Sequence, residues 1–102
     1  CADPASWFQS MVLSQEHPSF NLSYIKNPEW DAKIEEAMRL TATNRARAEE
    51  LYKEVQKGVL DGAYMVPIYD QVITYVVSKE IEGFYNNPAY PNSTLYFNIT
   101  HK

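Results

Sequence analysis

Cysteine, glycine, basic clusters and long apolar runs are all scarce in this chain, and each shortage removes a class of function. The 102 residues include one cysteine, three glycines and two histidines. A single cysteine forms no internal disulfide, and the cysteine and histidines show no metal-ligand spacing. Three glycines leave no loop that could cradle a phosphate. No apolar run approaches the roughly 18 residues that cross a bilayer.

Charge and composition describe a folded chain without an obvious charged partner. The net charge is -4, and no cluster of lysine or arginine forms a stripe, so we expect no nucleic-acid partner. Hydrophobic residues make up 45% of the chain, well above the level of disordered segments. The length suffices for one small domain with a real core.

Cys1 leaves three readings open. It could be the lipidated first residue of a bacterial lipoprotein, or it could pair with a cysteine upstream of this chain. We favour a third reading, in which Cys1 simply lies where the chain was cut. A lipoprotein usually follows its cysteine with a flexible polar tether, whereas here a helix start and then Trp7-Phe8 follow at once.

Local signals predict three helices in the first two thirds of the chain. Asp3 and Pro4 predict a helix over residues 4–13, because aspartate caps and proline suits the first turn. Asn27-Pro28-Glu29 predicts a second helix, and apolar residues then recur on one face as far as Thr41. Residues 45–60 predict a third helix, so that the last two form a helical hairpin.

The remaining third is rich in β-branched and aromatic residues. Residues 64–69, 72–77 and 95–99 are predicted strands, and residues 79–83 a turn or short strand. Pro67 cannot donate to a sheet ladder, so it marks an edge or a join. Six of the eight tyrosines lie at or after Tyr64. A segment this short and aromatic is expected to pack against something outside the chain.

No arrangement of residues predicts catalysis. Ser6, Ser10 or Ser14 with His17 would be a nominal triad, but these residue types are common and no G-x-S-x-G elbow is present. Adjacent glutamates on the helices point in different directions and suit a solvated face. We therefore expect neither an enzyme nor a cofactor, and no metal site.

Three blocks in order resemble the C-terminal fifth of the family 5 solute-binding proteins, the oligopeptide-, dipeptide- and nickel-binding class. The first block is Asp3-Pro4-Ala5-Ser6-Trp7-Phe8. The second begins with Tyr24 and Asn27-Pro28-Glu29 and continues through Leu51-Tyr52 to Gln56. The third is Val66-Pro67-Ile68-Tyr69, followed by Val77, Gly83-Phe84 and Asn87-Pro88.

The resemblance implies an α+β fragment of a larger protein. The order would be helix, helical hairpin, then two or three strands, as part of a two-lobe periplasmic-binding-protein-like α/β fold of type II. Residues 1–70 would belong to the second, ligand-closing lobe. Residues 71–102 would cross the hinge and return to the first lobe. The helical pair should be the best-ordered part, and the segment after Gln71 should be swapped, paired with a neighbouring molecule or loosely held.

The resemblance also implies a function. The full-length protein would be an extracytoplasmic, bacterial solute-binding protein in the periplasm or on the outer face of the membrane. It would capture an oligopeptide or dipeptide and deliver it to the permease subunits of an ABC importer, touching the membrane only through a lipid anchor. The alternatives are a non-peptide cargo (metal chelate, sugar or haem) and a free-standing lipoprotein interaction module.

Three residues are carried over from the family as ligand-site candidates. In peptide-binding members an aspartate a few residues before the D-P motif takes the ligand's ammonium group. Here Asp3 is the aspartate of D-P itself, so helix capping is its expected role and the ammonium partner is expected upstream. Tyr69 matches a family motif. Gln71 stands where some oligopeptide binders have a pocket tyrosine, a departure that changes the expected contacts.

Overall fold

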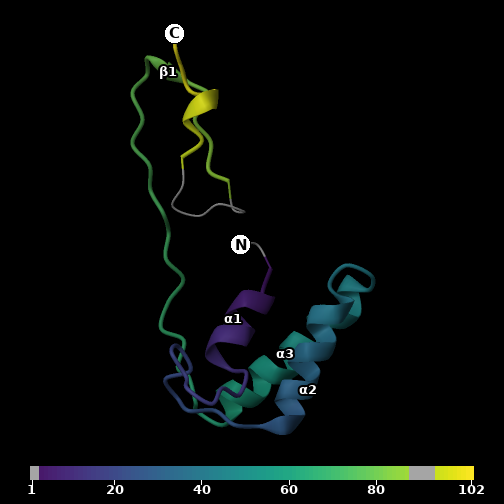
Figure 1. Cartoon of the computed structure of the whole chain (residues 1–102). Helices are drawn as coiled ribbons and strands as arrows, with labels where there is room; N and C mark the ends of the chain where they lie inside the picture. Colours follow the sequence, from purple (N-terminus) through teal and green to yellow (C-terminus); the bar gives the residue numbers. More distant parts are fainter. Residues whose placement is uncertain (1–2, 88–93) are drawn as a thin grey trace. The chain divides into compact units, whose positions relative to one another are not determined.

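The computed structural model describes residues 3–87 and 94–102, and it has the predicted α+β composition. Helices α1 (Ala5–Met11), α2 (Pro28–Leu40) and α3 (Arg45–Asp61) come first (Figure 1). The short strands β1 (Ile81–Glu82) and β2 (Thr100–His101) follow, with the 3-10 turn η1 (Tyr96–Asn98) between them. Cys1 and residues 88–93, which include two prolines, lie outside the described residues.

Side-chain caps determine where the helices begin. The Asp3 carboxylate accepts a hydrogen bond from the Ala5 amide at 2.7 Å, just before α1. The Asn27 side chain accepts from the amides of Glu29 and Trp30, and Asn44 accepts from the Arg47 amide. These bonds satisfy amide groups that the first turn of a helix leaves without a partner. The predicted helix starts are therefore confirmed to within a residue.

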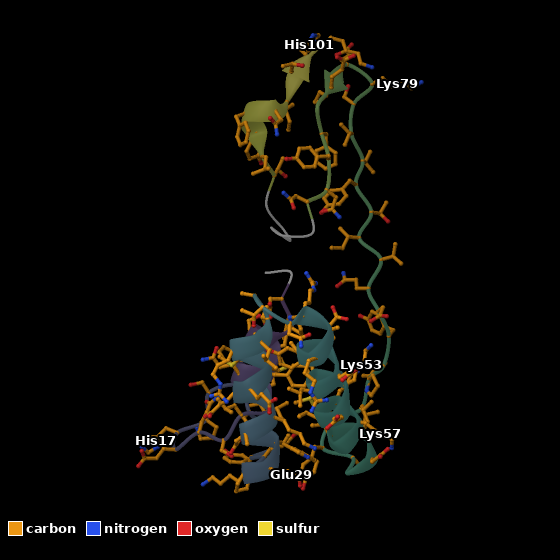
Figure 2. The ribbon with its side chains drawn as sticks, turned by 90° about the vertical axis from the view of Figure 1, so that its right-hand side faces the viewer. His17, Glu29, Lys53, Lys57, Lys79 and His101 are labelled. Carbon is orange, nitrogen blue, oxygen red and sulfur yellow. The ribbon has the colours of Figure 1, made fainter. Side chains whose placement is uncertain are left out.

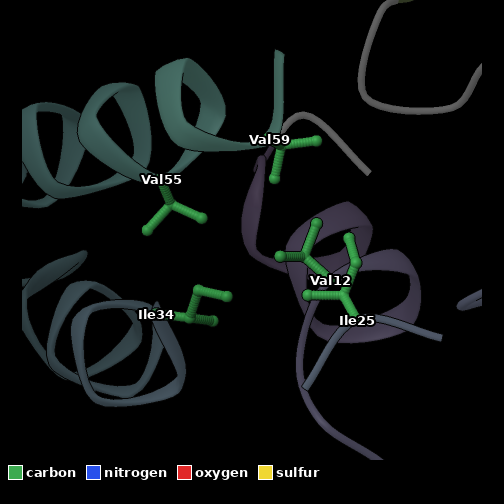
Figure 3. Packing of buried hydrophobic residues seen from close by; sticks show 5 residues of the cluster. All are labelled: Val12, Ile25, Ile34, Val55 and Val59. Atoms are coloured by element: carbon green, nitrogen blue, oxygen red, sulfur yellow. The ribbon is translucent and has the colours of Figure 1, made fainter. Parts of the chain in front are cut away.

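The helical hairpin and α1 enclose the buried core in two adjoining clusters. Figure 3 shows the first cluster, in which Ile34 of α2 meets Val55 and Val59 of α3. Val12 and Ile25, from the chain on either side of the loop after α1, complete it. The second cluster lies along the same hairpin and contains Ala37, Ala48, Leu51 and Tyr52. The apolar stripes read from the sequence are the surfaces that pack.

Hydrogen bonds of polar groups hold the loop between α1 and α2 in place. Asn21 is buried, and its amide donates to the Ile25 carbonyl at 2.9 Å while its oxygen accepts from the Ile25 amide at 2.9 Å. The Ser14 amide donates to the Asp31 carboxylate of α2 at 2.9 Å, and the Ser23 hydroxyl donates to the Tyr64 carbonyl at 2.6 Å. These bonds give a loop without regular structure a defined path, because buried polar groups need partners.

The second part of the chain pairs two very short strands. β1 and β2 are antiparallel, with Ile81 opposite His101 and Glu82 opposite Thr100. Gly83 follows β1 with a positive φ of 80°, and a Cβ there would lie 1.8 Å from the Asn98 carbonyl oxygen. Only glycine allows this close approach of two backbone segments. The turn or short strand predicted over residues 79–83 is confirmed, because residues 79–80 form a turn and β1 follows it.

The prediction of three longer strands is wrong. Residues 64–69 and 72–77 have no regular secondary structure, although Figure 1 draws 72–77 as an extended trace. Residues 95–99 contain the 3-10 turn η1 in place of a strand. A strand exists only when a neighbour completes its backbone hydrogen bonds, and the described residues offer none here. Composition alone indicated strand propensity correctly but not a partner.

The chain separates into two compact units, Asp3–Pro67 and Ile68–Lys102. The first contains all three helices, and the second contains β1, η1 and β2. The boundary predicted between residues 70 and 71 has a different meaning, because it would separate two lobes of a larger protein. That assignment to lobes stays a prediction.

Candidate ligand-binding site

Asp3 is used locally, at the start of α1. Its carboxylate binds the Ala5 amide, and its carbonyl oxygen accepts from the Ser6 hydroxyl at 3.3 Å. A carboxylate already engaged with a helix start is a weaker partner for a ligand ammonium group, because its remaining lone pairs are restricted in direction. The geometry agrees with capping as the local role of Asp3. A ligand contact by Asp3 stays a prediction.

Tyr69 and Gln71 lie in the second unit, two residues apart on the segment without regular structure. Both side chains are exposed, and neither makes a hydrogen bond within the described residues. Asp3 belongs to the first unit, so each of the three candidates is described by itself. The expected role of Tyr69 and Gln71 as pocket residues stays a prediction.

An apolar pocket of about 330 Å³ lies in the helical unit, and the sequence reading did not single it out. Its walls are Trp7, Phe8 and Met11 of α1, Val59 and Leu60 of α3, and residues 65–67. The sequence did contain a signal for this pocket. Helix α1 has more large apolar residues than a seven-residue helix can bury. Trp7 is accordingly 62% exposed.

The chemistry of this pocket is limited to holding apolar groups. The Gln56 side chain and the Trp7 indole are its polar groups, and no charged side chain lines it. Its volume falls at the lower end of the range of small-molecule sites, roughly 300–1,000 Å³. The two methionines give walls that adapt to the shape of a guest. The pocket therefore suits an aliphatic or aromatic group and offers nothing to a carboxylate or ammonium end.

Tyr52 is the one buried side chain in the described part of the chain whose polar atom has no hydrogen-bond partner. Its ring stacks on Phe8, with centroids 4.8 Å apart and an interplanar angle of 25°. The neighbouring Thr41 hydroxyl donates to the Ala37 carbonyl instead. Burial raises the pKa of Tyr52, because an ionised phenol would lose its hydration, and the nearby Thr41 hydroxyl offsets part of this rise.

The surface charges form ordinary ion pairs along the helices. Lys33 of α2 contacts Glu29 at 2.9 Å and Glu54 of α3 at 3.2 Å, and these two carboxylates raise the pKa of Lys33. Figure 2 shows Lys53 and Lys57 projecting from α3. Solvent screens pairs this exposed, so they contribute little to stability.

In the part of the chain that the structure describes, neither histidine belongs to a group of residues that could hold a metal ion. His17 points out of the loop after α1, and His101 contacts Glu80 at 3.5 Å beside β2 (Figure 2). Across residues 3–87 and 94–102, no group of three potential ligands converges. In the same residues, no helix is long and apolar enough to cross a membrane.

Comparison with known proteins gives one distant relative. No protein-family model and no solved structure matches the chain. It is 28% identical over 86 residues to heme-binding protein A of Haemophilus influenzae. The similarity covers 84% of this chain but 15% of that protein, so the chain spans a small part of the length of the relative that it matches.

Proposed function

We propose that this chain forms part of an extracytoplasmic solute-binding protein that delivers its ligand to an ABC importer. The observation that carries the proposal is a similarity to heme-binding protein A along 84% of the chain. The three ordered sequence blocks support it, because they resemble solute-binding proteins over nearly the same length. The activity proposed is capture and release of a ligand, without catalysis.

Peptides are the proposed cargo. Backbone hydrogen bonds hold a peptide without reading its side chains, and hydrated or apolar pockets then accept varied side chains. The exposed segment with Tyr69 and Gln71 has unused polar groups for such contacts. The apolar pocket beside α1 suits one apolar side chain. Asp3 caps a helix, so the peptide's ammonium group is assigned to an acidic residue outside this chain.

Haem is the second candidate, favoured by one specific observation. The relative found by comparison is named as a heme-binding protein. An apolar surface and a tyrosine or histidine ligand are common in haem sites. This chain has an apolar pocket and several exposed tyrosines.

Titration of the full-length protein separates these cargoes. We expect isothermal titration of the protein with a pool of short peptides to give saturable heat. When the protein is mixed with hemin, we expect the Soret absorbance band to stay that of free hemin. Saturable spectral change with hemin and no heat with peptides would replace peptide by haem. No response to either, with a correctly folded protein, would contradict both.

Variants of the full-length protein test the site residues. Tyr69→Ala and Gln71→Ala should each weaken ligand binding several-fold, because each removes a contact from the proposed cleft. Gln9→Ala is the matched control, since Gln9 is exposed on α1 and its side chain makes no hydrogen bond within the described residues. Equal affinities for all three variants would remove Tyr69 and Gln71 from the site.

The 102-residue chain alone should bind no peptide measurably. It contributes at most one wall of a cleft, and one wall offers too few contacts to offset the entropy of ordering a peptide. Isothermal titration of the isolated chain checks this. Tight binding by the chain alone would overturn the proposed division of the site between two lobes.

A further inference from the structure

We draw no further inference here: the strongest candidate, the apolar pocket that α1, the end of α3 and residues 65–67 enclose, carries nothing beyond the apolar side chain already proposed for it, because nothing in the described part of the chain shows what covers it.

Discussion

The buried hydroxyl of Tyr52 is the residue whose environment departs furthest from the usual rules. Its ring fills the second core cluster and stacks on Phe8, which is favourable. Its oxygen is buried without a hydrogen-bond partner, which costs about 1–3 kcal/mol. The ring and the hydroxyl therefore act in opposite directions on stability.

Removing that hydroxyl should not destabilise the chain. Tyr52→Phe keeps the ring and removes the unpaired group, so the free energy of unfolding at neutral pH should stay the same or rise by up to about 1–2 kcal/mol. Urea denaturation measures this, with Tyr24→Phe at an exposed position as control. A loss of more than about 1 kcal/mol would show that the hydroxyl has a partner after all.

The same residue predicts a dependence on alkaline pH. Burial raises the pKa of Tyr52 above its ordinary value of 10.0 in the folded state, so the unfolded chain releases this proton first. Stability should therefore fall as the pH rises through 10, since the unfolded state binds fewer protons there. The thermal midpoint of Tyr52→Phe should fall less than that of the unaltered chain over this range. Equal losses in both proteins would contradict the assignment.

At the scale of elements, single polar side chains determine where the helices start. Asn27 accepts two amide hydrogen bonds at the start of α2, 3.0 Å from Glu29 and 3.2 Å from Trp30. Asn27→Ala should lower the free energy of unfolding by about 1 kcal/mol in urea denaturation. Asn27→Ser keeps a capping oxygen and should lose much less. Equal losses for both variants would assign the effect to something other than capping.

Gly83 has the corresponding role for the paired strands β1 and β2. A Cβ at this position would overlap the Asn98 carbonyl oxygen, and the positive φ is itself unfavourable for other residues. Gly83→Ala should abolish the pairing, so that the Lys102 amide, which donates to the Glu80 carbonyl at 2.8 Å, exchanges its hydrogen rapidly. Glu82→Ala, in β1, should keep that protection. Hydrogen exchange followed by NMR reads both variants, and retained protection in Gly83→Ala would refute the argument.

The helices could be predicted from the sequence and most of the strands could not, for a physical reason. A helix completes its hydrogen bonds within one segment, so caps such as Asn27 and Asn44 and an apolar stripe suffice to predict it. A strand needs a neighbour. Residues 72–77 have strand composition, yet no described segment pairs with them. The pocket beside α1 was missed because it depends on how α1 meets α3.

At the scale of the whole molecule, the core lies entirely within one unit. Every buried hydrophobic residue in the described part of the chain lies between Val12 and Val59. A chain of residues 3–67 should therefore keep the helical circular dichroism signal and unfold cooperatively on heating, because it retains the contacts that bury apolar surface. Loss of the helical signal on this truncation would show that residues 68–102 hold the helices together.

The sequence by itself determined the three helices, the hairpin of α2 and α3, and the resemblance to solute-binding proteins, because caps, periodicity and motif order are local or linear properties. Only the tertiary structure decided that the Tyr52 hydroxyl is buried without a partner, that an apolar pocket forms beside α1, and that Gly83 passes close to Asn98. These features depend on contacts between residues far apart along the chain, and such contacts follow from packing rather than from any one segment.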